Sequence, residues 1–152
     1  MANRLACLIV AEMTQSSIVI AAAPTVIMDV IADVEAYTEW ISGIDRATAF
    51  DVDADGRPAE ATFSGNLGLI KDTYSVAYEW AETEVHWHLT KGEMLNDLHG
   101  EYACTDLGDG KTKVDYSLTV DLAIPVVGLL RRRGEKVIVD SALKGLKRRV
   151  EG

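Results

Sequence analysis

Apolar and polar side chains alternate along five successive runs between residues 61 and 122. In the run from Tyr74 to Trp80, every even-numbered residue is aromatic or aliphatic. A period of two places such side chains on one face of a β-strand. A slip by one residue would turn the whole apolar set of a strand to solvent, so a shared parity specifies the pairing strongly. The alternation predicts an antiparallel sheet that covers a core on one side.

Short turns between the runs predict how the strands pair. A four-residue loop after Trp80 places this residue opposite Val85, and a two-residue turn at 68–69 places Phe63 opposite Tyr74. In both pairs an apolar side chain meets another on the same face, which supports the register.

A further two-residue turn is predicted at 91–92, because such hairpin loops favour glycine. This register places Val85 opposite Leu98 and His86 opposite Asp97. It keeps the apolar sides of the two strands together.

The sheet-forming runs lie within a longer order of elements. A strand beginning at Ile18 leads through Ala-Ala-Ala-Pro into an amphipathic helix and then a second helix that closes on Trp40. After six further strands, a helix entered at Pro125 carries apolar residues at helical spacing up to Val150. We therefore predict an α+β fold. A curved seven-stranded antiparallel sheet wraps around a long C-terminal helix, and two short helices lie between strands 1 and 2.

Small residues form a strip along this last helix. Gly134, Ser141 and Gly145 fall on nearly one side of it. Each interior glycine costs about 1 kcal/mol relative to alanine, so the strip requires a structural reason. Two reasons remain open: a close approach of the helix to the sheet, or room for a ligand between them.

The chain length bounds the domain organisation. Its 152 residues predict one domain, which we place at 16–150, and we expect 1–15 to be a disordered extension. Cys7 and Cys104 form no spaced framework, which favours a reduced, cytoplasmic setting. No stretch approaches the roughly 20 apolar residues that span a bilayer, so no transmembrane segment is expected.

The charge distribution limits the partners. The net charge is −9, with the acidic excess in residues 1–130 and a basic segment at 131–152. An acidic surface repels phosphates, so we expect no nucleic-acid partner. Arg131, Arg132 and Arg133 are interpreted as a solvated part of the helix. The alternative is a transient contact with an anionic membrane surface or an acidic carrier protein. We expect a monomer.

The segment from Ile18 to Trp40 resembles the opening of the START-like, or SRPBCC, superfamily, which has the helix-grip fold. Asp33, Tyr37 and Trp40 stand where that pattern has an acidic residue, an aromatic residue and a tryptophan. The resemblance covers residues 16–150 and is nearest to the polyketide cyclase/dehydrase and lipid-transport branch, and the closing run from Leu129 to Val150 looks especially like small actinobacterial members of that branch. It implies a deep apolar cavity between sheet and helix. It does not imply one reaction, because members bind lipids, hormones, quinones or polyketides and only some transform them.

Parity and resemblance together predict the walls of this cavity. We expect the ligand to contact Tyr37, Trp40, Phe63, Tyr74, Val76, Tyr78, Trp87, Asn96, Leu98, Tyr102, Leu118, Leu130, Val137, Ile138 and Ser141. Aromatic rings can stack on a flat ligand, and tyrosine hydroxyls can orient it. Trp80 and Tyr116 share the inner face and are interpreted as core. The predicted function is the binding or transport of a lipid, polyketide or quinone-like molecule.

A polyketide aromatase/cyclase or dehydrase is the first alternative, and a module that binds a partner protein is the second. Cyclisation needs a donor or cation near a carbonyl and a base near the adjacent carbon. Arg46, Tyr37 and Tyr74 are the weak candidates. Arg46 shares a face with Phe50, so it points inward only if Phe50 does. No inward carboxylate or histidine is evident, and the missing base favours a carrier.

Two polar clusters are interpreted without a ligand. His86, His88 and His99 lie on the predicted outer face beside acidic residues, where cross-strand charge pairs are the expected role. Residues 51–56 imitate the first half of a calcium loop, but Thr62 stands where the ion needs a bidentate glutamate. We expect neither a metal site nor a cofactor.

Overall fold

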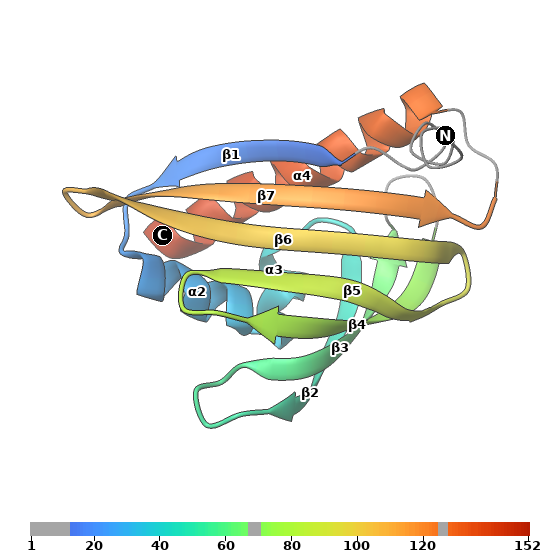
Figure 1. The fold of residues 1–152 in the computed structure, drawn as a ribbon, viewed down its shortest axis with the longest axis horizontal. Coiled ribbons are helices and arrows are strands. Elements are labelled where there is room, and N and C mark those ends of the chain that lie inside the picture. The colour runs from blue at the N-terminus through green and yellow to red at the C-terminus, as the bar shows by residue number, and fades with distance from the viewer. Residues whose placement is uncertain (1–12, 67–70, 125–127) are drawn as a thin grey trace, which may run out of the picture.

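The computed structural model describes residues 13–66, 71–124 and 128–152. In chain order its elements are β1 (Thr14–Ile20), α2 (Pro24–Ala32), the 3₁₀ helix η1 (Val34–Ala36), α3 (Tyr37–Trp40), β2 (Ile44–Val52), β3 (Pro58–Asn66), β4 (Lys71–Trp80), β5 (Glu84–Gly92), β6 (Leu95–Gly108), β7 (Lys111–Leu122) and α4 (Gly128–Glu151), as Figure 1 shows. α2 begins at Pro24, whose fixed φ suits the first turn of a helix.

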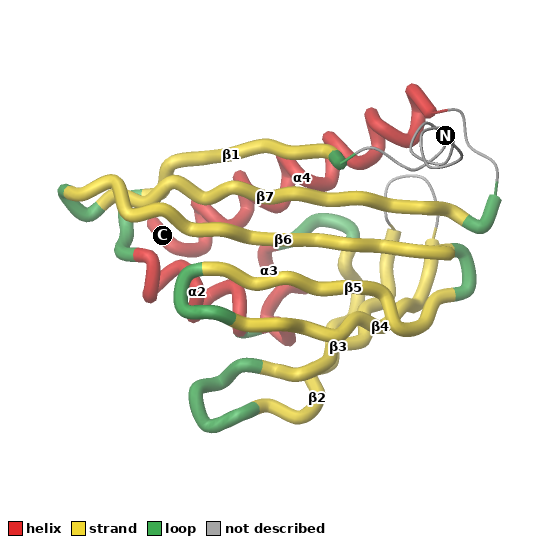
Figure 2. The backbone as a smooth tube through the Cα atoms, viewed as in Figure 1, coloured by secondary structure: helices red, strands yellow, loops and turns green. Residues whose placement is uncertain are grey.

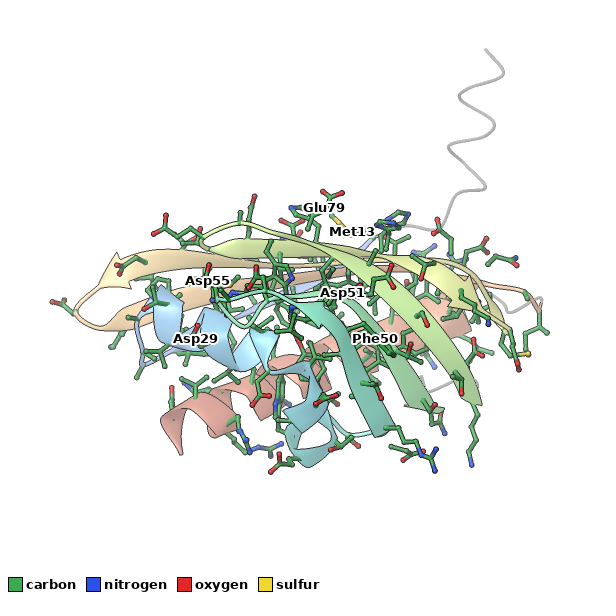
Figure 3. The ribbon with its side chains drawn as sticks, turned by 90° about the horizontal axis from the view of Figure 1, so that it is seen from below. Met13, Asp29, Phe50, Asp51, Asp55 and Glu79 are labelled. Atoms are coloured by element: carbon green, nitrogen blue, oxygen red, sulfur yellow. The ribbon has the colours of Figure 1, made fainter. Side chains whose placement is uncertain are left out.

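All seven strands form one antiparallel sheet in the order β1-β7-β6-β5-β4-β3-β2. α4 packs against β1, β7 and α2. The short helices lie on the same side of the sheet as α4, so the helices form one layer and the sheet another (Figures 2 and 3). This arrangement confirms the predicted α+β helix-grip fold.

Some predictions concern residues at or beyond the ends of the segments that the structure describes. β1 begins at Thr14, inside the segment assigned to the N-terminal extension, and residues 1–12 lie outside the description. The predicted turn at 68–69 and the helix entry at Pro125 also lie outside it. Among the described helices, none combines the length and apolar character needed to cross a membrane.

The strand register is confirmed at two hairpins and wrong at a third. Trp80 pairs with Val85 and Phe63 with Tyr74, as predicted. β5, however, continues through Gly92, so the turn predicted at 91–92 lies farther along the chain.

The correct pairing places Val85 opposite Tyr102 and His86 opposite Glu101. The carboxylate of Asp72 accepts hydrogen bonds from the backbone N–H groups of residues 93 and 94, at 3.3 and 3.1 Å, and thereby holds the turn in its later position. The shift is an even number of residues, so the apolar face is preserved.

α4 approaches α3 closely at Gly145. A Cβ at this position would overlap the backbone carbonyl oxygen of Trp40. Helix-to-helix packing is therefore the reason for the small residue at this point of the strip, and the buried Leu146 and Val139 anchor the same helix in the core.

Candidate ligand-binding site

A cavity of about 80 Å³ lies between the inner face of the sheet and α4. Its walls are formed by Tyr37, Ile41, Ser42, Ile44, Phe63, Asn66, Tyr74, Val76, Tyr78, Trp87, Leu98, Tyr102, Tyr116, Leu118, Val120, Ile138 and Ala142. Ser42 and Asn66 are also exposed to solvent, so they mark the side on which the cavity approaches the surface.

The position of α4 accounts for this space. The helix rests on β1 and β7, at one edge of the sheet, and on α2. The inner faces of β4, β5 and β6 therefore carry side chains that face the cavity, such as Tyr78, Trp87 and Leu98.

Aromatic rings line the cavity in two groups of contacting residues. Tyr37 stacks on Phe63 with a centroid separation of 5.8 Å, and Phe63 lies 5.6 Å from Tyr74. On the other strands Trp87 contacts Tyr102 at 5.4 Å, and Tyr102 meets Tyr116 edge-on at 4.5 Å. Such rings supply flat apolar surfaces for stacking. They also occupy most of the space, which explains the small volume.

The tyrosine hydroxyls fall into two groups. Tyr37 donates its hydroxyl hydrogen to the backbone oxygen of Ile31. Among the described residues, no hydrogen-bond partner is present for the hydroxyls of Tyr74, Tyr78, Tyr102 and Tyr116. Burial raises the pKa of each of these four phenols well above its ordinary value. They remain protonated at neutral pH and can donate hydrogen bonds to a ligand oxygen, but they cannot act as bases.

No carboxylate or imidazole is present among the cavity-lining residues that the structure describes. Apart from the tyrosines, the polar lining side chains are those of Ser42 and Asn66. The cavity can therefore enclose and orient a molecule, whereas its described walls provide no group to abstract a proton.

The structure brings most of the predicted contact residues together. Those that line the cavity are Tyr37, Phe63, Tyr74, Val76, Tyr78, Trp87, Leu98, Tyr102, Leu118 and Ile138. Strand parity identified the residues of β3 to β7 among them, because it depends on the face and not on the exact register.

Five predicted residues lie elsewhere. Leu130 and Val137 are 51% and 61% exposed, because they project from the solvent side of α4. Asn96 is exposed and donates from Nδ2 to the backbone oxygen of Leu122 at 3.4 Å. Trp40 packs beneath α4 at its contact with α3, and Ser141 is half-buried outside the lining.

Several lining residues were not predicted. Val120 follows Leu118 with the same parity, and Ala142 follows Ile138 by one helical turn. The sequence pattern could therefore have identified Val120 and Ala142. Tyr116 lines the cavity although it was interpreted as core. Ile41, Ser42, Ile44 and Asn66 lie where neither periodicity applies.

Arg46 lies outside the cavity. A register shift between Ile44 and Arg46 lets Ile44 and Ala47 both pack toward the core. The arginine is consequently exposed, and Phe50, which shares its face, is 45% exposed. Arg46 is thus a surface residue and does not supply a cation to the cavity.

Arg131 is not a free cation for docking. Its side chain is 20% exposed, and its Nε lies 4.0 Å from Oε1 of Glu135. Glu135 itself is only 2% exposed. It accepts hydrogen bonds from the backbone N–H of Val120 at 2.9 Å and from the Thr14 hydroxyl at 3.3 Å.

This buried carboxyl was not identified from the sequence. Burial raises the pKa of Glu135, while its hydrogen bonds and the nearby arginines oppose that shift. Its contacts join α4 to β7 and β1, so it fixes the helix on the edge of the sheet and does not face the cavity.

Fold and site together define a helix-grip domain with an aromatic cavity between its sheet and its long helix. The chain matches the family described as polyketide cyclase / dehydrase and lipid transport over residues 12–151, and it belongs to this family.

Solved structures share this fold. A START superfamily protein from Mycobacterium smegmatis is 23% identical, with a TM-score of 0.84 over 91% of this chain and 97% of that chain. A protein from Thermus thermophilus is 21% identical, with a TM-score of 0.79 over 92% and 97%. The Zhui aromatase/cyclase from Streptomyces sp. R1128 is 10% identical, with a TM-score of 0.75 over 92% and 93%. These identities show a common fold only. A search of curated protein sequences finds no match.

Proposed function

We propose that this protein binds a hydrophobic small molecule between the inner face of its sheet and α4. The observation that carries the proposal is an aromatic cavity lined by four tyrosines whose hydroxyls make no hydrogen bond to another described residue. These hydroxyls border open space in the cavity and are not sealed against protein atoms, so a ligand can reach them. A planar molecule with several carbonyl or hydroxyl oxygens, such as a polyketide or quinone, would supply both the stacking surface and the missing acceptors.

Binding of such a molecule requires the cavity to widen. Its volume of about 80 Å³ is below the roughly 300–1,000 Å³ typical of pockets for drug-sized ligands. α4 rests mainly on one edge of the sheet, so displacement of this helix away from β4 to β6 enlarges the space without breaking the sheet.

A matched pair of variants on α4 tests this site. Ile138 lines the cavity, whereas its neighbour Val137 faces solvent. Ile138→Trp should fill the cavity, and Val137→Trp should leave it open. Native mass spectrometry of freshly purified protein would reveal a retained ligand, and titration with 8-anilinonaphthalene sulfonate would measure the accessible apolar site.

We expect the wild type and Val137→Trp to bind the probe and Ile138→Trp to lose it while remaining folded by circular dichroism. Equal probe binding by both variants would place the apolar site elsewhere. A wild type that retains no ligand and binds no probe would exclude the carrier function.

An aromatase/cyclase function is the second candidate. It is favoured by the tyrosine donors, which can polarise a carbonyl, and by fold relatives such as the Zhui aromatase/cyclase. The lack of a base among the described lining residues argues against it. Turnover of an aromatic polyketide precursor, lost on Tyr74→Phe but retained on Arg46→Met, would establish this function in place of simple carriage.

A further inference from the structure

The chain has three histidines, and all of them lie on the outer face of the sheet, opposite the cavity. His86 on β5 stands between two carboxylates, with Glu79 across from it on β4 and Glu101 across from it on β6. His88 lies one rung farther along β5, directly opposite His99. Figure 3, which labels Glu79, shows that none of the described helices covers this face.

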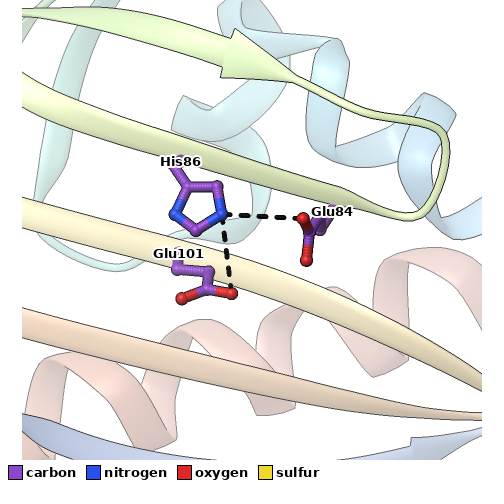
Figure 4. A group of neighbouring side chains, drawn as sticks. All are labelled: Glu84, His86 and Glu101. Atoms are coloured by element: carbon purple, nitrogen blue, oxygen red, sulfur yellow. Dashed lines mark ion pairs between the residues drawn. The ribbon is translucent and has the colours of Figure 1, made fainter.

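The His86 ring faces two carboxylate oxygens without a hydrogen bond to either. Its Nε2 lies 3.8 Å from Oε1 of Glu84 and 3.7 Å from Oε1 of Glu101 (Figure 4). These distances exceed hydrogen-bond length. By contrast, His99 lies 3.1 Å from Asp97 and is hydrogen-bonded to it. Glu84, His86 and Glu101 each offer one possible ligand atom, and these three atoms all lie within 4.8 Å of one another.

This spacing is close to that of a tetrahedral metal site. Zinc binds imidazole nitrogen and carboxylate oxygen at about 2.0–2.2 Å, so neighbouring donors in a tetrahedron lie about 3.4 Å apart. The side chains of Glu84 and His86 are half exposed and that of Glu101 is a third exposed, so small rotations can close the remaining gap. An imidazole donor favours zinc over calcium and magnesium, which prefer oxygen ligands alone.

Although the sequence pattern alone favours charge pairs without a metal here, we propose that Glu84, His86 and Glu101 form a zinc-binding site on the outer face of the sheet. A surface hollow of about 400 Å³, lined in part by Glu79, His88 and His99, lies over this face. It leaves room for water in the fourth coordination position, as in sites with three protein ligands. The site lies on the opposite side of the sheet from the cavity, so it does not depend on the ligand-binding proposal.

Calorimetric titration of tag-free, EDTA-treated full-length protein with zinc chloride at neutral pH tests this site. We expect one zinc ion per chain. Loss of an outer-shell partner alone commonly weakens metal binding by about 10–100-fold, so His86→Asn and Glu101→Gln should each weaken it by about tenfold or more. His99→Asn removes another exposed imidazole from the same face and should leave the affinity unchanged.

Three results would overturn the assignment. They are no zinc binding by the wild type, undiminished binding by His86→Asn, and a loss of binding in His99→Asn equal to that in His86→Asn. The substituted side chains are exposed or partly exposed, and far-ultraviolet circular dichroism of each variant separates loss of the metal from loss of the fold.

Discussion

Trp87 lies with its indole ring directly over Gly100, its cross-strand partner on β6. A Cβ on Gly100 would overlap the edge of that ring formed by Cε2, Cζ2 and Nε1. Because the Trp87 ring is also a wall of the cavity, the absence of a side chain at Gly100 determines how far this wall extends into the interior. One glycine on a strand thus influences both packing and the shape of the site.

Gly100→Ala should therefore destabilise the protein by about 1–3 kcal/mol, the usual cost of overpacking a core. The added methyl group must push the Trp87 ring toward the cavity, since the ring and Gly100 face each other across the strands. Urea unfolding followed by circular dichroism measures the effect. In a Trp87→Leu background the same change should cost much less, and an unchanged cost there would contradict the assigned contact.

Gly145→Ala should also destabilise the protein, by about 1–3 kcal/mol. The methyl group would meet the backbone carbonyl of Trp40, which cannot rotate aside as a side chain can. Elsewhere in a helix the same change adds stability through helix propensity. Thermal or urea unfolding measures the effect, with Lys144→Ala at the exposed neighbouring position as a control that should change stability by less than about 0.5 kcal/mol. A Gly145→Ala variant as stable as the wild type would show that α3 can move away from α4 without cost, and would contradict this prediction.

Stability should depend on pH through Glu135. Burial raises the pKa of this carboxyl above its ordinary value of 4.5, so the folded state binds its proton more tightly than the unfolded state does. The corresponding stabilisation is present below the ordinary pKa and is lost as the pH rises through the raised one. Relative to Glu135→Gln, the wild type should become less stable from about pH 4 toward neutrality. Urea unfolding of both proteins across this range measures the difference.

Glu151 provides a control for which stability should change with pH in the opposite direction. Its carboxylate accepts hydrogen bonds from Lys147 Nζ at 2.8 Å and from the backbone N–H of Ala21 at 2.9 Å. These contacts lower its pKa, so its stabilisation is lost as the pH falls. Relative to Glu151→Gln, the wild type should gain stability as the pH rises. The Glu135 assignment is wrong if both comparisons change in the same direction.

The sequence predicted the faces of the elements better than their exact alignment. Alternation identified the inner side chains of β3 to β7, and this result survived the misplaced turn at 91–92 because the shift was even. The turn itself depends on hydrogen bonds from residues 93 and 94 to Asp72, a residue on another strand. Local turn preference contains no information about such a long-range acceptor.

Local irregularity and helix rotation limited two further predictions. The register shift after Ile44 breaks the parity of β2, so parity alone left the orientation of Arg46 open, and the structure places this residue at the surface. On α4, the apolar residues cover more than one side, and only packing on β1 and β7 selects Ile138 over Val137 as the one that faces the cavity. The buried Glu135 was missed for a related reason, since its partners come from distant strands.

The stability of the protein should respond differently to removal of the hydroxyl from Tyr37, which is hydrogen-bonded, and from Tyr74, which is not. Tyr37→Phe deletes the donor to the backbone oxygen of Ile31 and should cost about 0.5–1.5 kcal/mol, or more if that buried oxygen stays unpaired. Tyr74→Phe removes a hydroxyl with no partner among the described residues and should be neutral or slightly stabilising. Urea unfolding of the ligand-free proteins measures both.

If the cavity tyrosines serve a ligand, Tyr74→Phe should lower affinity for an oxygen-bearing aromatic compound such as a naphthoquinone while stability is preserved. A loss of stability in Tyr74→Phe as large as that in Tyr37→Phe would show that its hydroxyl serves the fold instead.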